Sequence, residues 1–330
     1  MSRNLSCTRP AKAGRCRISL KQNNGESSIS NGSASPKILV IVGPTASGKT
    51  SLSIKLAKKF NGEVISADSR QVYKGMDLGT GKVTKKEMQG IKHYLLDVAS
   101  PKSRFSAGQF VKLGEKAVKQ ILAKGKLPIV CGGTGFYIDA LLYGLPVAVA
   151  PDWKLRQRLE KLSASQLLNK LKRVDAKRAK NIDPHNKRRL IRALEIALKT
   201  GAPVPPPTRI LKYDVLKIGV KRDKKELRKR IHERLLIRMK QGMVKEIEKL
   251  HKQGVSWQKL DDFGLEYRFI ARYLKEELSK EEMLVQLETA IWHYAKRQMT
   301  WFKRNKEINW DNNIKKIEKL VKKWLFDRMS

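Results

Sequence analysis

Short apolar runs alternate with helical patterns along the first half of this chain. The runs lie at 38–42, 64–66, 94–96 and 128–130, and the clearest helical patterns at 106–124 and 136–143. Strands that alternate with helices in sequence usually form a parallel sheet with helices on its faces. The pattern therefore predicts an α/β fold with a parallel sheet core of the phosphate-loop type.

The second half of the chain is mainly helical and dense in Lys and Arg. Helical patterns fill 152–200, and a proline-rich stretch at 202–207 is typical of an extended, exposed connection. A strand-like run at 215–220 follows it and returns the chain to the sheet. We therefore predict a helical insertion at 151–208 between a first core part, 37–150, and a core completion with basic C-terminal helices at 209–330.

Two long amphipathic patterns follow the insertion. Apolar residues repeat every fourth position from Leu227 onward, which predicts one helix over 223–252 with Arg and Lys on its other face. A second helical pattern over 280–304 mixes aromatic and basic residues, a mixture that can grip phosphates and stack on unpaired bases. The helical spacing of Trp301 and Phe302 fits a buried core face equally well.

The turn after the first apolar run matches the phosphate-loop pattern G-x-x-x-x-G-K-[ST]. Its residues are Gly43, Pro44, Thr45, Ala46, Ser47, Gly48, Lys49 and Thr50. A strand before it and a helix after it are the context that this motif requires. Its backbone N–H groups and the helix N-terminus would hold phosphate oxygens, while Lys49 neutralises charge and the Thr50 hydroxyl ligates Mg²⁺. The loop predicts a phosphate compound without saying which one.

Other unusual residues also follow directly after predicted strands. Asp68 comes after the second strand, Asp97 after the third, and the glycine-rich run 132–135 after the fourth. In parallel sheets ligands bind beyond the carboxyl ends of the strands. We therefore expect these residues to lie around one site together with the phosphate loop.

The charge of the chain indicates a polyanionic partner. With 71 Lys and Arg against 31 Asp and Glu, the formal net charge is +40. Nucleic acid is the first candidate for such a partner. The three cysteines have no zinc-binding spacing, which predicts a reduced, intracellular protein, and no apolar stretch is long enough to cross a membrane.

Residues 1–36 differ in composition from the rest of the chain. They hold eight serines, six Lys or Arg and a single acid, Glu26, without periodic apolar positions. We expect a disordered basic extension and a cytoplasmic protein. An Arg-rich, Ser-rich and acid-poor segment also fits an organelle transit peptide, which is the alternative for localisation.

Five motifs together resemble the tRNA dimethylallyltransferases, also called tRNA isopentenyltransferases. They are GPTASGKT at 43–50, DSRQVYKGMDLGTGK at 68–82, GGTGFYIDALLYGL at 132–145, DPHNKRRLIRALEIALKTG at 183–201 and YAKRQMTWFKR at 294–304. The resemblance spans about 37–305 in the order of the family. It implies transfer of a dimethylallyl group from dimethylallyl diphosphate to N6 of the adenine immediately 3′ of the anticodon, tRNA position 37, with release of diphosphate.

The resemblance also implies roles for individual residues. Asp68 would be the general base, Thr45 would contact the oxygen that bridges carbon and phosphorus, and Mg²⁺ would bind at Thr50. Arg230 and Arg234 would join the phosphate loop in holding diphosphate. The residues implied to contact tRNA are Asp68, Ser69, Arg70, Gln71, Thr134, Arg156, Lys187, Arg188, Arg189 and Arg192.

The chain departs from the family pattern at three places. The paired histidines appear as Lys92 and His93, GTAKP appears as GTGKV, and GxGYKE appears as GLEYRF at 264–269. The last change questions any role for that segment. The zinc finger of eukaryotic members has no counterpart, so we expect a bacterial-type enzyme that acts as a monomer on the tRNA anticodon stem-loop.

Three other functions fit parts of the sequence. A prenyltransferase for free adenine nucleotides would share the loop but would not need the basic insertion. A small-molecule kinase would form ADP, whereas prenyl transfer forms diphosphate. An RNA-binding protein without activity would explain the charge and leave Asp68 and the phosphate loop unused. An ATP-binding role inferred from the loop alone would therefore be misleading.

Overall fold

The computed structural model describes residues 35–145, 149–205 and 210–327. The predicted N-terminal extension, 1–36, lies outside these ranges except for its last two residues. Pro206 and Pro207 of the predicted proline-rich connection also lie outside them.

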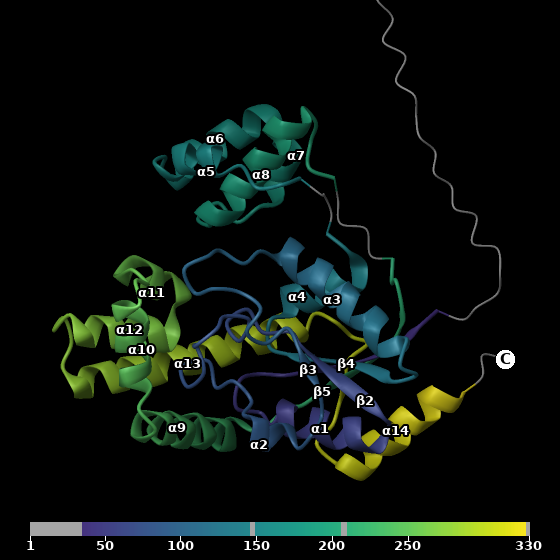
Figure 1. Ribbon diagram of the computed structural model, residues 1–330. Coiled ribbons are helices and arrows are strands. Elements are labelled where there is room, and N and C mark those ends of the chain that lie inside the picture. Colours follow the sequence, from purple (N-terminus) through teal and green to yellow (C-terminus); the bar gives the residue numbers. More distant parts are fainter. Residues whose placement is uncertain (1–34, 146–148, 206–209, 328–330) are drawn as a thin grey trace, which may run out of the picture. The chain divides into compact units, whose positions relative to one another are not determined.

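A six-stranded parallel sheet forms the core (Figure 1), with the strand order β3-β2-β4-β1-β5-β6. The strands are β1 (Lys37–Val42), β2 (Gly62–Ser66), β3 (His93–Tyr94), β4 (Leu127–Gly132), β5 (Asp214–Gly219) and β6 (Asn309–Trp310). The central strand β1 pairs with β4 on one side and β5 on the other. The predicted α/β fold with a parallel sheet is confirmed.

Helices cover both faces of the sheet. Ile38 and Val40 of β1 belong to a hydrophobic cluster with α3 (Ala107–Leu122) and α4 (Gly135–Tyr143), above the sheet in Figure 1. Leu39 and Ile41 belong to a cluster with α1 (Lys49–Lys59) and α14 (Ile314–Phe326), below the sheet. Successive side chains of a strand point to opposite faces of the sheet. A continuously apolar strand is therefore buried on both faces of the sheet.

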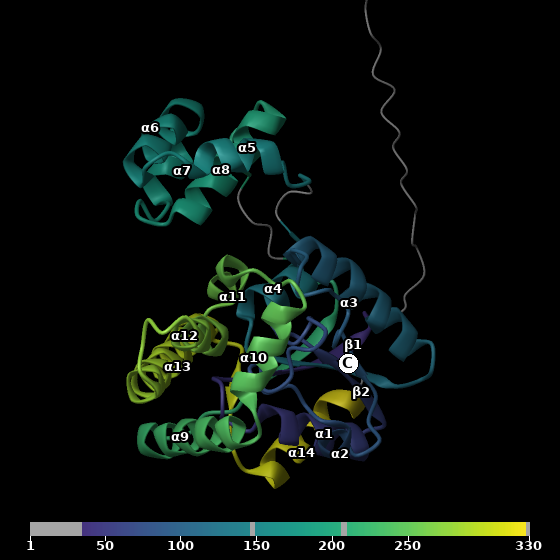
Figure 2. The same ribbon diagram turned by 60° about the vertical axis from the view of Figure 1, so that its left-hand side comes forward.

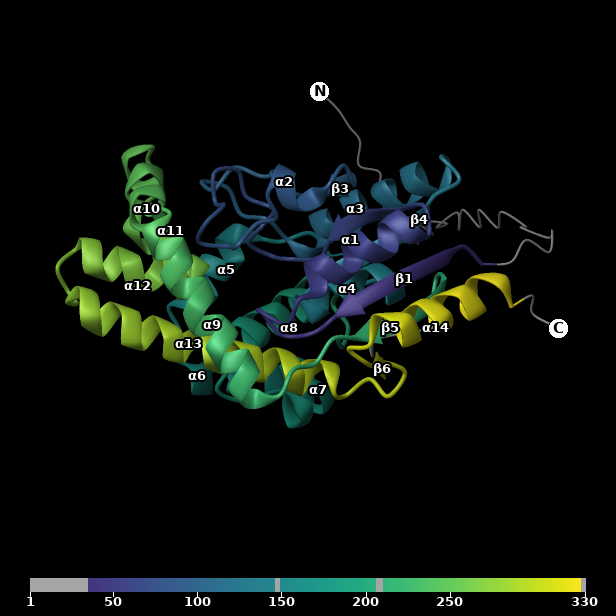
Figure 3. The same ribbon diagram turned by 90° about the horizontal axis from the view of Figure 1, so that it is seen from below.

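A second helical core adjoins the sheet domain. It contains α9 (Lys224–Lys240), α10 (Met243–Lys252), α11 (Trp257–Phe263), α12 (Leu265–Leu274) and α13 (Lys280–Phe302), which group together in Figure 2. Val72 and Met76, from the segment after β2, are fully buried in the same core. Figure 3 shows α13 running from this group toward the sheet. The segment after β2 is thus held between the two cores. The short helix α2 (Lys85–Met88) follows it.

The prediction of one helix over 223–252 is wrong. α9 ends at Lys240 and α10 begins at Met243, because Gly242 adopts a left-handed conformation with φ of +97°. Glycine takes this conformation without the steric cost of a side chain, and it commonly ends helices.

The segment between α4 and β5 forms four helices with a hydrophobic cluster of their own. They are α5 (Trp153–Glu160), α6 (Ala164–Val174), α7 (Ala176–Asn181) and α8 (Lys187–Thr200). Leu167 and Leu171 of α6 pack with Leu190 and Leu194 of α8, and all four are buried. This cluster contains no residue of the sheet or of α9–α13.

Candidate active site

The phosphate loop connects β1 to α1 in a conformation that requires glycine at position 43. Gly43 has a φ of +151°, and a Cβ there would lie 2.4 Å from the Val220 carbonyl oxygen. α1 begins without a side-chain cap, so its first N–H groups are available to an anion. The Ser47 hydroxyl is buried and has no hydrogen-bond partner in the described part of the chain. A phosphate oxygen would satisfy these donors.

Lys49 brings a positive charge to the loop. Its Nζ donates a hydrogen bond to the Pro44 carbonyl oxygen at 2.6 Å. Burial lowers the pKa of Lys49 to about 8, against the opposite effects of Cys131 and Asp68, and with help from Arg234. A lysine that has lost hydration in this way gains most from an anionic ligand.

Asp68 follows β2 at the same edge of the sheet. Its Oδ1 accepts the backbone N–H groups of Arg70 at 2.8 Å and Gln71 at 3.3 Å. Among the described residues, Oδ2 has no hydrogen bond. The neighbouring Ser69 N–H donates to the Thr134 hydroxyl at 3.1 Å, which joins this turn to the glycine-rich loop after β4. One carboxylate oxygen thus orients the group and leaves the other for a ligand.

Three arginines of α9 form one side of the site. Arg230, Arg234 and Arg238 are spaced by four residues and line the same cleft. Arg230 is paired with Glu226 at 2.5 Å, and Arg238 with Glu266 at 2.9 Å. Arg234 makes no ion pair within the described ranges. Burial, followed by the charge of Arg238, lowers the pKa of Arg234. An uncompensated arginine beside other cations is suited to bind an anion.

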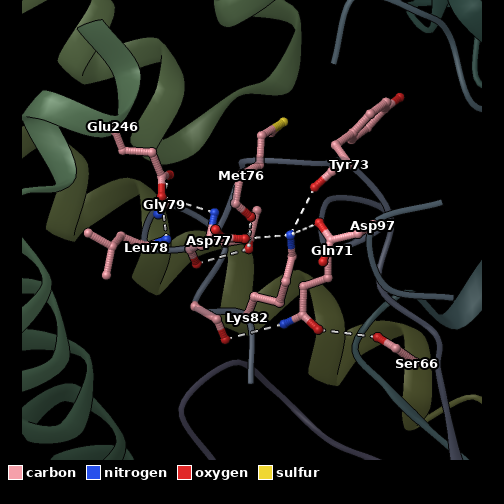
Figure 4. A network of polar contacts seen from close by, with 12 residues as sticks. Ser66, Gln71, Tyr73, Met76, Asp77, Leu78, Gly79, Lys82, Asp97 and Glu246 are labelled. Atoms are coloured by element: carbon pink, nitrogen blue, oxygen red, sulfur yellow. Dashed lines mark hydrogen bonds and ion pairs between the residues drawn. The ribbon is translucent and has the colours of Figure 1, made fainter. Parts of the chain in front are cut away.

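Lys82 holds the segment after β2 together (Figure 4). Its largely buried ammonium group donates to the Tyr73 carbonyl oxygen at 2.9 Å and to Asp77 and Asp97, both at 2.6 Å. The carboxylate of Asp97, predicted to lie near the site, is therefore used inside this network. The Gln71 amide donates to the Gly81 carbonyl oxygen at 3.3 Å. The network orients the segment that carries Asp68 to Gln71.

Glu246 of α10 ties the same segment to the helical core (Figure 4). Its carboxylate accepts the N–H groups of Asp77 at 3.0 Å, Leu78 at 2.6 Å and Gly79 at 3.0 Å. It also accepts the Tyr267 hydroxyl at 3.0 Å. Tyr267 belongs to the GLEYRF segment that departs from the family pattern, and this segment therefore supports the wall of the site.

These elements enclose a cleft of about 800 Å³. It is lined mainly by polar and charged side chains of the phosphate loop, the turn after β2, α9 and α13. The lining includes Thr45, Ser47, Lys49, Thr50, Asp68, Ser69, Arg70, Gln71, Arg230, Arg234, Arg238, Tyr267, His293, Tyr294, Arg297 and Gln298. The cleft thus brings together the residues predicted for diphosphate and for the acceptor base. The Thr134 hydroxyl is linked to the cleft indirectly, because it accepts the backbone N–H of Ser69, which lines the cleft.

The residues predicted to bind tRNA within the helical insertion divide into two groups. Arg156 pairs with the fully buried Glu195 through Nε at 2.9 Å and Nη2 at 2.7 Å, and Arg192 pairs with the same carboxylate. These two arginines are engaged in holding α5 against α8. Lys187, Arg188 and Arg189 are exposed in the first turn of α8. Lys187 donates to the Glu160 carbonyl oxygen at 2.9 Å, while Arg188 lies 3.9 Å from an Asp262 carboxylate oxygen and is one of the residues that line the cleft.

Comparison with known proteins identifies the family. A family model described as IPP transferase matches residues 71–305. A tRNA dimethylallyltransferase of Acetivibrio thermocellus is 42% identical over 301 residues, covering 86% of this chain and 95% of that protein. This chain belongs to the tRNA dimethylallyltransferase family. The five sequence motifs had indicated the same family.

Solved structures of tRNA dimethylallyltransferases share the fold. A tRNA isopentenylpyrophosphate transferase from Bacillus halodurans matches with a TM-score of 0.67 and 36% identity, covering 88% of this chain and 96% of that one. A eukaryotic dimethylallyltransferase acting on tRNA matches with a TM-score of 0.79 and 26% identity, covering 89% and 80%.

Sequence reasoning missed several residues at this dimethylallyltransferase site. Arg222 donates from Nε to the Ser47 carbonyl oxygen at 3.2 Å, and Arg238 contacts the segment after β2. Gln298 of α13 bonds both glycine-rich loops. The spacing of Arg230 and Arg234 offered a signal for Arg238, one helical turn further on. Nothing local in the sequence indicates the contacts of Arg222 or Gln298.

The aromatic residues at the end of α13 belong to the core. Phe302 is 3% exposed in the cluster above the sheet, and Trp301 packs against the same cluster. A Cβ on Gly135 would lie 2.2 Å from the Trp301 ring, so the absence of a side chain at Gly135 leaves space for that ring.

In the described ranges, no helix is long and apolar enough to span a membrane, and no group of three or more His, Cys, Asp or Glu could hold a metal.

Proposed function

We propose that this chain transfers the dimethylallyl group of dimethylallyl diphosphate to N6 of adenine 37 of tRNA. The observation that carries the proposal is the cleft that contains both the phosphate loop and the Asp68 carboxylate. In the proposed reaction the adenine N6 attacks the first carbon of the dimethylallyl group. The bond between that carbon and the diphosphate oxygen breaks, and diphosphate leaves with the electron pair.

The diphosphate would be held by the phosphate loop and the arginines. The free N–H groups at the start of α1, the Lys49 ammonium, Arg230 and Arg234 form a set of positive groups around the loop. Negative charge on the diphosphate grows as the carbon–oxygen bond breaks, so these groups stabilise the transition state more than the substrate.

Mg²⁺ would bind beside the diphosphate at Thr50. Mg²⁺ commonly uses only one or two protein ligands together with phosphate oxygens and water. Thr50 is exposed in the first turn of α1 and lines the cleft, so its hydroxyl fits this mode of binding. When bound, the ion would neutralise charge on the leaving group.

Asp68 would accept the proton that N6 loses as the new bond forms. An exocyclic adenine amine is a poor nucleophile, so a positioned carboxylate assists it. The backbone bonds to Oδ1 hold the carboxylate in place and leave Oδ2 available for the amine. Thr45, which also lines the cleft, would contact the oxygen that bridges carbon and phosphorus.

The acceptor adenine must leave the stacked anticodon loop to reach this cleft. Ser69, Arg70 and Gln71 follow Asp68 and are candidates to contact the base, with Thr134 beside them. Lys187, Arg188 and Arg189 of α8 are exposed and are candidates for the tRNA phosphates. A cytoplasmic location agrees with the proposed tRNA substrate.

Incubation with dimethylallyl diphosphate, Mg²⁺ and an anticodon stem-loop tests the proposal. The digested nucleosides should gain one five-carbon unit on adenosine, with diphosphate released and no ADP formed from added ATP. AMP offered as acceptor should react far more slowly than the stem-loop. An unmodified stem-loop, with a folded protein, would contradict the proposal.

The Asp68→Ala variant tests the role of the carboxylate. We expect near-normal stem-loop affinity and turnover lowered by about 10²-fold or more. Asp311→Ala is the matched control, because Asp311 also accepts two local backbone N–H groups, those of Asn312 and Asn313, but follows β6 away from the cleft. Unchanged turnover in Asp68→Ala would remove this residue from the mechanism.

A further inference from the structure

The carboxamide of Gln298 joins two loops that are far apart in sequence. Its Oε1 accepts the backbone N–H of Thr45 in the phosphate loop at 2.8 Å. Its Nε2 donates to the carbonyl oxygen of Gly133, in the glycine-rich loop after β4, at 3.0 Å. The side chain is 6% exposed, and a Cβ on Gly133 would lie 2.2 Å from its Nε2. Glycine at 133 is therefore required for this contact.

The two partners determine which way the carboxamide points. An N–H group can only donate and a carbonyl oxygen can only accept, so only one orientation satisfies both bonds. The Thr45 N–H is consequently occupied within the protein, unlike the free N–H groups at the start of α1. This bond fixes the position of the Thr45 backbone, and with it the position of the Thr45 hydroxyl. The N–H groups nearest Lys49 remain available to phosphate.

We propose that Gln298 is a positioning residue that aims the Thr45 hydroxyl at the oxygen linking the dimethylallyl carbon to phosphorus. This inference rests on the role proposed above for Thr45. Gln298 lies on α13, whose residues His293, Tyr294 and Arg297 also line the cleft. The helix that forms one wall of the acceptor cleft thereby sets the geometry of the donor loop.

Positioning of Thr45 differs in its kinetic effect from binding of diphosphate. Lys49, Arg230 and the N–H groups of α1 do not depend on the carboxamide. Loss of the carboxamide should therefore lower kcat and leave the KM for dimethylallyl diphosphate within about threefold. A misplacement of about 1 Å near the reacting atoms can cost about 10²-fold in rate. We expect kcat of Gln298→Met to fall about 30- to 100-fold.

A double-mutant cycle tests whether Gln298 acts through Thr45. Gln298→Met keeps the length of the side chain and removes both hydrogen bonds, while Thr45→Ala removes the hydroxyl and keeps the backbone N–H. If Gln298 serves the hydroxyl, the double variant should have nearly the kcat of Thr45→Ala alone. Multiplied losses in the double variant would overturn the proposal, because Gln298 would then act independently of Thr45.

Two controls separate this result from misfolding and from failure of the proposed function. Thr300→Ala changes an exposed residue of α13 whose hydroxyl donates to the helix carbonyl oxygen of Lys296 and makes no other hydrogen bond within the described part of the chain, so kcat should stay unchanged. Circular dichroism at the assay temperature identifies folded variants. A raised KM with unchanged kcat in Gln298→Met would also overturn the proposal. Absence of transfer by the unsubstituted protein would instead contradict the function itself.

Discussion

Lys49 is the residue whose protonation most directly affects the phosphate loop. Its pKa of about 8 results first from burial, which disfavours the charged form. An anion in the loop favours the charged form and raises the pKa. Binding of diphosphate and uptake of a proton by Lys49 are therefore linked, and the linkage becomes visible where free Lys49 loses its proton.

Diphosphate affinity should consequently depend on pH. We expect nearly full affinity below about pH 7, about half of it at pH 8 and roughly 30-fold weaker binding at pH 9.5, because the free protein then has a neutral Lys49 that must first take up a proton. Calorimetric titration with inorganic diphosphate, without Mg²⁺, measures this. Lys49→Arg is the control, since a guanidinium stays charged throughout. Equal profiles for both proteins would show that Lys49 does not titrate in this range.

The residues of the site differ in how far the sequence could predict them. The phosphate loop and Asp68 lie in local motifs, where neighbouring residues define the chemistry. Gln298 and Thr45 are separated by 253 positions, and their contact exists only because α13 packs against the sheet. The family resemblance implied that Arg156 and Arg192 contact tRNA, but both pair with the buried Glu195. A motif places an arginine in the chain and does not identify the carboxylate that the fold brings against it.

At the scale of secondary structure, Glu63 links the start of β2 to neighbouring elements. It is 3% exposed and accepts hydrogen bonds from Tyr94 of β3 at 2.7 Å, and from Lys126 at 2.9 Å and Lys124 at 3.0 Å just before β4. Burial opposes ionisation, but the bonds from Lys126, Tyr94 and Lys124 outweigh it and lower the pKa of Glu63 to about 2.

This carboxylate should contribute to stability above its ordinary pKa. Because its pKa is lower in the folded state, the contribution is complete above about pH 4.5 and is lost as the pH falls toward 2. We expect Glu63→Gln to lower the free energy of unfolding at pH 7 by about 2 kcal/mol. The decrease in this free energy between pH 5 and 3 should also be smaller in the variant than in the unsubstituted protein. Urea unfolding measures both. Glu248→Gln, in an exposed pair with Lys252, should change neither.

Elements were predictable where one periodicity continued without interruption. The buried strands and α13 have such patterns. The break between α9 and α10 depends on one glycine, while apolar positions continue beyond it at Met243 and Ile247, so the periodicity concealed the break. The two-residue strand β6 is held by pairing with β5 and by no pattern of its own. Its formation depends on tertiary packing, which a local pattern does not contain.

At the scale of the whole molecule, the cations that produce the net charge of +40 lie in different environments. Some cations are engaged inside the protein, as Lys82, Arg156 and Arg192 are. Others are exposed, including Lys187, Arg188 and Arg189 of α8 and several lysines of α14. The total charge predicted a polyanionic partner but could not say which of these cations contact it.

Salt dependence of stem-loop binding distinguishes the exposed groups. Each cation that neutralises an RNA phosphate releases counterions, so affinity falls as salt rises, with a slope of about 0.7 to 0.9 per contact. Replacing Lys187, Arg188 and Arg189 together by Ala should lower the slope by about 2 and weaken binding most at low salt. Binding titrations between 50 and 300 mM salt measure both effects.

The matched control replaces Lys315, Lys319 and Lys322 of α14 by Ala. These lysines are also exposed and the net charge changes equally, but they lie on the helix that covers the face of the sheet with α1. If α8 contacts the RNA backbone, only the α8 variant loses salt dependence, because counterion release follows contacts rather than total charge. Equal losses in both variants would mean that the general positive field of the molecule attracts the RNA and that α8 has no special part.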